Sequence, residues 1–121
     1  MSILLSALVQ AVNELSKGNE VRGWHAYKRR GKPLQAFFNK KLGWVVKCPV
    51  LILDQRTPLF VRVPTIRLNC DWVAQPIVIK NDLKVACERI RKQLVSYKGI
   101  HPDLHCGNVG WHENTAVMFD W

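Results

Sequence analysis

The chain has 121 residues, of which 48% are hydrophobic and 22% charged, so we expect one folded domain and exclude a disordered chain. Eighteen Lys and Arg against nine Asp and Glu give a net charge of +9, which favours polyanionic partners such as nucleotides or nucleic acid. No apolar stretch is long enough to span a bilayer, which excludes an integral membrane protein.

The N-terminal apolar segment lacks the basic residues that open a secretory signal, and Gln10, Asn13 and Glu14 interrupt it. We therefore expect a cytoplasmic protein. The cysteines show no C-x-x-C spacing, which predicts free, buried thiols in a reducing compartment. They are Cys48, Cys70, Cys87 and Cys106.

The first predicted element is a helix. Apolar residues recur with a period of 3.6 from Ile3 to Leu15, Ser2 is a suitable N-cap, and Gly18 is a suitable stop. The apolar face of this helix is wide. We expect a homodimer to cover it, because a symmetric pair needs only one self-complementary patch.

Short strands are predicted to follow the helix. Residues 21–28 alternate loosely between polar and apolar side chains, residues 30–33 are typical of a turn, and residues 34–42 are ambiguous. Pro64 argues against a central place in a sheet for one of the later strands. Those later strands are predicted at residues 44–47, 61–68, 72–74 and 77–79.

A second helix is the clearest element, with Asn81 or Asp82 as its cap and Gly99 as its end. Its solvent-exposed face contains Glu88 and Lys92, which are spaced to form an i,i+4 ion pair. Its buried stripe consists of Leu83, Ala86, Cys87, Ile90 and Leu94. Two strands, near residues 109–111 and 116–119, are predicted to close the chain around a turn at 112–115. The expected class is α+β: a small antiparallel sheet, an N-terminal helix, and a second helix that leads into a loop.

That loop carries the most specific motif of the sequence. It has the form H-x-D-L-x-x-x-N from His101 through Asp103 to Asn108, and Asp120 follows after two predicted strands. The pattern resembles the catalytic loop and metal-binding Asp of the protein-kinase-like superfamily. With His105 in D-L-H-x-G-N, it is more similar to the aminoglycoside phosphotransferase and choline-kinase branch than to eukaryotic protein kinases.

The resemblance implies a role for each residue. Asp103 would be the base that orients a hydroxyl group, and Asn108 and Asp120 would bind Mg²⁺. His101 and His105 would hold the loop. The segment around Lys47 resembles the strand that carries the phosphate-binding lysine, and residues 70–80 resemble the strand that leads to the adenine-binding hinge. The implied activity is transfer of the ATP γ-phosphate to a hydroxyl group.

Some features depart from the family. There is no G-x-G-x-x-G motif, no Glu lies between Lys47 and Val61, and the sequence given stops at Asp120 and Trp121, before any substrate-binding lobe. We therefore expect a single truncated kinase-like domain over residues 1–121. It would be a miniature enzyme, a fragment or a relic, and a protein partner could supply the missing lobe.

Other interpretations stay open. A non-catalytic protein could keep the kinase-like shape and bind a partner, or the motif could be a chance turn of Asp, Gly and Asn. Basic clusters at residues 28–32 and 40–41, interleaved with Trp24, Tyr27, Phe37 and Phe38, suggest a nucleic-acid surface. Lys47 could be a surface lysine, and Trp44 and Trp72 are expected in the core. His101, His105, Cys106 and His112 are zinc-type ligands, but they fit no standard zinc spacing, and Cys106 is expected to be a packed small residue.

Overall fold

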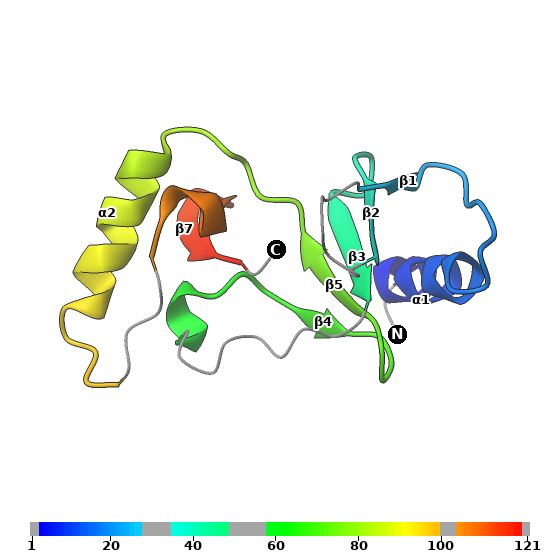
Figure 1. Cartoon of the computed structure of the whole chain (residues 1–121), viewed down its shortest axis with the longest axis horizontal. Helices are drawn as coiled ribbons and strands as arrows, with labels where there is room; N and C mark the ends of the chain where they lie inside the picture. The colour runs from blue at the N-terminus through cyan, green and yellow to red at the C-terminus, as the bar shows by residue number, and fades with distance from the viewer. Residues whose placement is uncertain (1–2, 28–34, 49–57, 100–103, 120–121) are drawn as a thin grey trace. The chain divides into compact units, whose positions relative to one another are not determined.

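The computed structural model describes residues 3–27, 35–48, 58–99 and 104–119 (Figure 1). The chain divides into two compact units. Unit 1 comprises residues 1–50 and 65–77, and unit 2 comprises residues 51–64 and 78–121. Within the described ranges, no helix is both long and apolar enough to cross a membrane.

Unit 1 contains an antiparallel sheet with the strand order β1-β2-β3-β5-β4. Its register aligns Phe37, Val46, Ala74 and Ile66 across four strands, so these side chains share one face of the sheet. The strands are β1 (His25–Ala26), β2 (Gln35–Asn39), β3 (Trp44–Cys48), β4 (Ile66–Arg67) and β5 (Val73–Pro76).

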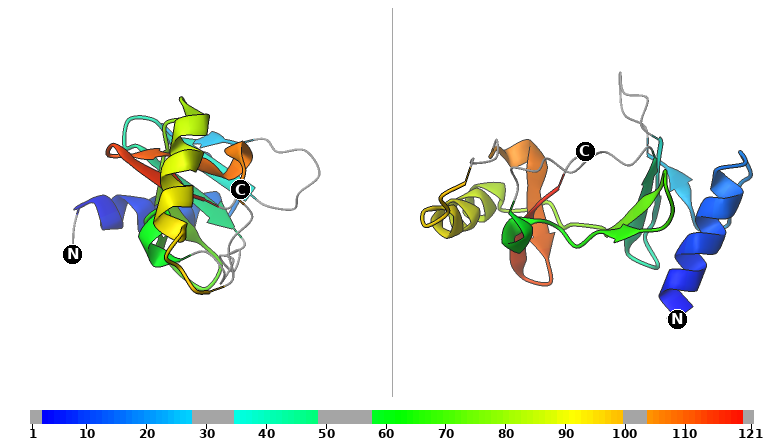
Figure 2. Two further views of the ribbon diagram at one scale, coloured as in Figure 1. Left: turned by 90° about the vertical axis from the view of Figure 1, so that its left-hand side faces the viewer. Right: turned by 90° about the horizontal axis from the view of Figure 1, so that it is seen from below.

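Helix α1 (Ile3–Leu15) covers that face of the sheet, and the right-hand view of Figure 2 shows it lying along the strands. Its buried residues are spaced as one helical stripe, and they pack against Val46, Trp72 and Ala74. Gly18 follows the helix with a φ of +85°, which glycine adopts without strain. The buried residues of α1 are Leu8, Ala11, Val12 and Leu15.

Unit 2 is built from helix α2 (Leu83–Leu94) and a hairpin of β6 (Val109–His112) and β7 (Thr115–Met118). Two short 3₁₀ helices, η1 (Leu59–Val61) and η2 (Cys106–Asn108), complete the unit. The buried stripe of α2 packs against the hairpin and Val61. The core consists of Val61, Ala86, Cys87, Ile90, Leu94, Val109, Ala116 and Met118.

Neighbouring segments extend the hairpin on both sides. Ile79 exchanges two backbone hydrogen bonds with Trp111 of β6, and the N–H of Val63 donates to the carbonyl of Met118 in β7 at 2.8 Å. The turn between the strands has positive φ at Glu113 and Asn114, as a two-residue type I′ turn requires. The hairpin is therefore held on both edges by single segments of the same unit.

The predicted α+β class is confirmed in these elements: an N-terminal helix, a five-stranded antiparallel sheet, a second helix and a hairpin. The predicted strand at 44–47 and the closing hairpin are confirmed. Trp72 is buried and Trp44 packs against the same core, as predicted. The expected Ser2 cap and the turn at 30–33 lie outside the described residues.

Several strand boundaries were wrong. The strand expected over 21–28 is limited to the two residues of β1, because Gly23 adopts a positive φ that ends the extended segment. The segment 61–68 is not one strand either. Pro64 divides it, so Val63 bonds to β7 while residues 66–67 form β4 in unit 1. Residues 77–79 form only the Ile79 bridge, and the preceding strand β5 ends at Pro76.

The second helix also differs at its ends. It ends at Leu94 rather than at Gly99, because its buried stripe ends there and Val95 is exposed. Asp82 occupies the N-cap position, but its side chain makes no capping hydrogen bond. Glu88, which was expected to pair with Lys92, forms its ion pair with Arg91 one turn along the helix.

Candidate functional site

Three of the predicted site residues are described by the structure: Lys47, His105 and Asn108. The other three, His101, Asp103 and Asp120, lie outside the described residues. Lys47 belongs to unit 1, whereas His105 and Asn108 belong to unit 2, so each is considered within its own unit.

His105 and Asn108 cap the short helix η2 reciprocally. The Oδ1 of Asn108 accepts from the backbone N–H of His105 at 3.2 Å, and the Nδ1 of His105 accepts from the N–H of Gly107 at 3.0 Å. A third bond joins the N–H of Asn108 to the carbonyl of His105 at 3.1 Å. These bonds fix the side chains of both residues within the loop, as a capping box does.

Gly107 is required by the same arrangement. A Cβ atom at this position would lie 2.9 Å from Nδ1 and Cε1 of the His105 ring, which is closer than such contacts normally come. The imidazole of His105 therefore folds over a glycine backbone. The hydrogen bonds of the cap join only residues within the sequence H-C-G-N.

The hairpin returns to Asn108. The N–H of Phe119, directly after β7, donates to the carbonyl of Asn108, directly before β6, at 2.9 Å. The register pairs Val109 with Met118 next to this bond. The two segments that carry the end of the motif are thus bonded at the backbone, and Asp120 is the next residue of the sequence.

Positive charge lies along the hairpin. The ammonium of Lys80 is 4.8 Å from the ring centroid of Phe119, and the guanidinium of Arg89 is 5.0 Å from that of Trp111. These two cations favour an anionic ligand near the hairpin. Sequence analysis did not identify them, because they come from two separate segments.

Lys47 is buried, with 2% of its surface exposed, on the central strand β3. The surface-lysine interpretation is therefore excluded. Its side chain shares a face of the sheet with Ala36 and Val73, its register partners, and this face is opposite to the one that α1 covers.

Gln75 is a second buried polar residue on the same face as Lys47. It is 2% exposed, and its Nε2 donates to the hydroxyl of Thr65 at 3.0 Å. Within the described part of the chain, its Oε1 has no hydrogen-bond partner. Sequence analysis missed this residue, although a Gln inside the apolar run of residues 73–79 was the available signal.

The cysteines were expected to be free and buried, and the structure confirms this only in part. All four cysteines are free thiols, but only Cys87 is buried, and Cys106 is exposed rather than packed. Among residues 3–27, 35–48, 58–99 and 104–119, no group of three or more His, Cys, Asp or Glu is placed to hold a metal ion. The zinc interpretation would need His101, which is outside those ranges.

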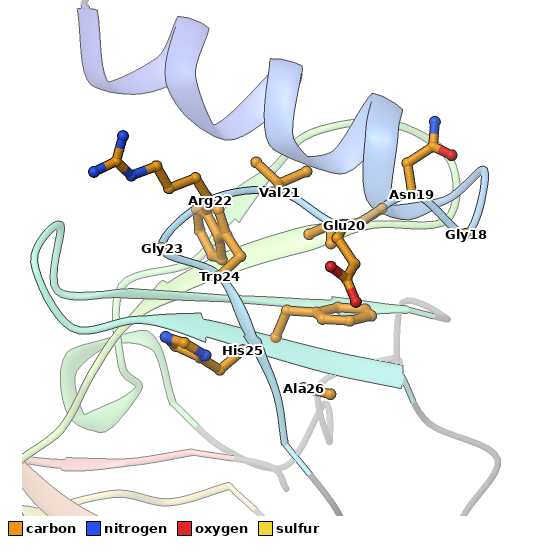
Figure 3. Close-up of a pocket in the computed structure, with 11 residues that line it drawn as sticks. Gly18, Asn19, Glu20, Val21, Arg22, Gly23, Trp24, His25 and Ala26 are labelled. Carbon is orange, nitrogen blue, oxygen red and sulfur yellow. The ribbon is translucent and has the colours of Figure 1, made fainter.

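A hollow of about 730 Å³ lies elsewhere, in unit 1, along the loop between α1 and β1. Residues 18–26 form most of its wall, with Leu15 and Phe37 (Figure 3). Figure 3 shows the guanidinium of Arg22 pointing away from the other labelled side chains. None of the predicted site residues lines this hollow, so it does not contribute to the candidate site.

The structure describes only some of the residues that were predicted to form a nucleic-acid surface. Phe37 and Trp24 are partly buried, because they pack against the core of unit 1. Tyr27 and Phe38 contact each other edge to face, with ring centroids 6.4 Å apart. Lys40 and Lys41 are exposed, and the cluster at 28–32 lies outside the described residues.

No protein-family model matches this chain, and no curated protein or solved structure matches it either. The kinase-like resemblance therefore depends on the motif between His101 and Asp120. The structure adds the geometry of the motif's described part: the η2 cap, the hairpin and the backbone bond between Asn108 and Phe119.

Proposed function

We propose that this chain is a kinase-like phosphotransferase, which transfers the γ-phosphate of ATP to a hydroxyl group with the help of Mg²⁺. The observation that carries the proposal is the hydrogen bond from the N–H of Phe119 to the carbonyl of Asn108. It brings the start of β6 and the end of β7 together, and Asp120 is the residue that follows Phe119 in the sequence. Two oxygen ligands from neighbouring positions suit Mg²⁺, which completes its shell with water and phosphate.

The side chain of Asn108 fits a ligand role. Its Oδ1 accepts a hydrogen bond from the N–H of His105. The capping bond therefore orients the oxygen, and an amide oxygen is the type of ligand that Mg²⁺ prefers. When bound, Mg²⁺ supplies charge neutralisation on the phosphate oxygens.

The remaining roles follow from the chemistry of phosphoryl transfer. Asp103 orients the acceptor hydroxyl and takes its proton as the hydroxyl oxygen bonds to the γ-phosphorus and the bond to ADP breaks. Lys47 keeps the phosphate-binding role that the resemblance implies, and it lies on the central strand β3 of unit 1. In unit 2, Lys80 and Arg89 against the hairpin favour an anionic ligand.

The test is a thermal-shift titration with ATP, with and without Mg²⁺, combined with transfer of labelled γ-phosphate to the protein, to added hydroxyl compounds and to water. A ligand at about a hundred times its Kd stabilises the folded state by about 2.7 kcal/mol, which is a measurable shift. Asp120→Ala is expected to abolish the Mg²⁺-dependent part of the shift. Asp103→Ala is expected to keep the shift and to lower the transfer rate by about 10²–10⁴.

Asp71→Asn is the matched control, because Asp71 is an exposed carboxylate on the loop between β4 and β5. It should change neither readout. A wild-type protein that shows no Mg²⁺-dependent shift and transfers no phosphate contradicts the proposal.

A second candidate is a non-catalytic protein that binds a partner. Unit 2 has large apolar side chains on its surface, which is typical of a surface that binds a partner. Leu59 is 80% exposed, Phe60 54% and Val95 78%. The rings of Phe60 and Tyr97 are in contact, with centroids 6.1 Å apart. This candidate is favoured if the biological effect of the protein survives both Asp103→Ala and Asp120→Ala but is lost in Leu59→Ser.

A third candidate is a nucleic-acid-binding module. Unit 1 contains ten of the eighteen Lys and Arg residues but only three acidic residues, Glu14, Glu20 and Asp71. Such a surface would bind labelled single-stranded RNA with an affinity that falls steeply with salt. Lys40→Ala with Lys41→Ala would then reduce the salt dependence, and an unchanged affinity would contradict this candidate.

The predicted homodimer also remains a proposal. Its original basis was the apolar face of α1, but four residues of that face are buried in the core of unit 1. Ile3 at the start of the helix is 90% exposed. Light scattering at high protein concentration tests the dimer directly.

A further inference from the structure

Two cysteines from distant parts of the sequence meet beside the capped loop. The Sγ of Cys87, on the buried face of α2, lies 4.0 Å from the Sγ of Cys106, the first residue of η2. Cys87 is 7% exposed and Cys106 is exposed, and both are free thiols. The pair therefore joins the helix to the segment that contains His105 and Asn108.

The fold of unit 2 creates this proximity. The stripe of α2 that contains Cys87 and Ile90 packs against the hairpin and against η2. A disulfide needs the two sulfurs at about 2.05 Å, so the pair must close by about 2 Å. Cys106 is exposed, so core packing does not oppose rotation of its side chain towards Cys87.

We propose that Cys87 and Cys106 form an oxidation-sensitive dithiol that closes to a disulfide in the presence of a peroxide. In the first step the peroxide oxidises the Cys106 thiol to a sulfenic acid, and the peroxide O–O bond breaks to release water. In the second step the Cys87 sulfur bonds to the Cys106 sulfur, the S–OH bond breaks, and a second water leaves. The two thiols lose one hydrogen each, and the peroxide is reduced by two electrons.

The environments of the two sulfurs set the order of these steps. Cys106 is accessible to a peroxide in solution, whereas Cys87 is enclosed by the core. Burial raises the pKa of Cys87, with a further contribution from its contact with Cys106. A thiol that is slow to ionise is a poor first target. At 4.0 Å, however, it has a high effective concentration for the second step.

Closure of the disulfide would tie the loop to α2 next to the Asn108 amide. The consequence for nucleotide binding rests on the proposed function, whereas formation of the bond does not. If Asn108 binds Mg²⁺, oxidation is expected to weaken the Mg²⁺-dependent thermal shift, and a dithiol reductant is expected to restore it. If the protein binds no nucleotide in either redox state, the proposed function fails and the disulfide assignment is unaffected.

Trypsin separates the four cysteines, which makes the pairing directly measurable. After treatment with hydrogen peroxide and alkylation of the remaining thiols, Cys87 is expected on peptide 85–89 and Cys106 on peptide 99–121. The expected product is these two peptides joined, with a mass two hydrogens below their sum. Peptides 48–56 and 68–80, which contain Cys48 and Cys70, should be found alkylated.

A urea-unfolded sample is the reference. Neighbouring cysteines are separated by similar lengths of chain, so their loop-closure entropies are similar and an unfolded protein should give mixed pairings. Dominance of the 87–106 pair in the native monomer supports the proposal. The same mixture in native and unfolded protein overturns it, as does pairing of Cys106 between two copies.

Single substitutions complete the test. Cys106→Ser removes an exposed thiol, so it should abolish the joined peptide while the protein stays folded. Cys70→Ser is the matched control, because Cys70 is also exposed and free and lies in the other unit, and it should leave the joined peptide at the wild-type yield. A Cys106→Ser protein whose nucleotide response stays as peroxide-sensitive as the wild type contradicts the regulatory consequence alone.

Discussion

The reciprocal cap of η2 is the part of the candidate site whose energetics can be worked out from the structure. In Asn108→Ala, the N–H of His105 loses its acceptor, which now lies at 3.2 Å. Asn108 is half-buried, so water replaces the lost acceptor only in part. Removal of a capping side chain typically costs about 1 kcal/mol, and the loss of one hydrogen bond to a neutral acceptor costs about the same.

The measurement is urea unfolding followed by circular dichroism, with the midpoint shift converted through an unchanged m-value. For a chain of this length, about 1 kcal/mol corresponds to a decrease in Tm of roughly 3–5 °C. Asn108→Asp is the matched variant, because the carboxylate keeps an acceptor at the same position. It should remain within about 0.5 kcal/mol of the wild type.

His105→Ala provides the second arm of the experiment. It removes the Nδ1 acceptor of the Gly107 N–H, at 3.0 Å, and should also cost about 1 kcal/mol. Because both side chains stabilise the same turn, the double variant should cost less than the sum of the two single variants. Additive effects, or no loss in Asn108→Ala, would show that the cap does not act as a unit.

The same variants separate stability from ligand binding. Under the proposed function, Asn108→Ala loses the Mg²⁺-dependent thermal shift, whereas His105→Ala keeps it despite a comparable loss of stability. Asn108→Asp keeps both the cap and an oxygen ligand. A wild-type-like Mg²⁺ response in Asn108→Ala would remove Asn108 from the ligand set.

Three further predictions concern the cores and the thiol. Leu8→Ala and Ile90→Ala each leave a cavity at a fully buried site, so each should lower the free energy of unfolding by about 2–5 kcal/mol. Hydrogen exchange should rise first in α1, β3 and β5 for Leu8→Ala. For Ile90→Ala it should rise first in α2, β6 and β7. An equal rise everywhere would contradict the assignment of these residues to separate clusters. Gly110→Ala should cost about 1–3 kcal/mol in urea unfolding, because its Cβ would lie 2.9 Å from Val78, and a neutral effect would mean that the segment around Val78 yields freely. The raised pKa of Cys87 means that the folded state holds this thiol proton more tightly than the unfolded state. Its contribution to the free energy of unfolding is therefore complete below the unfolded pKa and is lost as pH rises through the folded pKa. In urea unfolding measured at a series of pH values, Cys87→Ser should reduce the loss of stability at alkaline pH, and an unchanged pH dependence would contradict this prediction.

The elements with strong local signals were predictable from the sequence. The 3.6-residue stripes of α1 and α2 set which side of each helix is buried, because the apolar residues must leave water together. The hairpin was predictable because two short apolar runs flank a polar turn, and His112 and Thr115 close it at the predicted place. The local cap at His105 and Asn108 also depends on residues that are close in sequence, although only the general role of the loop was inferred.

What the tertiary structure decided depends on contacts between distant residues. The chain alone does not specify that residues 61–68 serve two sheets, since only pairing with β5 and β7 divides them at Pro64. The burial of Lys47 follows from its place on a central strand, and a lysine between apolar residues could equally have faced water. The meeting of Cys87 with Cys106 is of the same kind, because it arises only when the stripe of α2 packs against the hairpin and its preceding loop. Periodicity determines which face of an element is buried, and packing between elements determines what that face contacts.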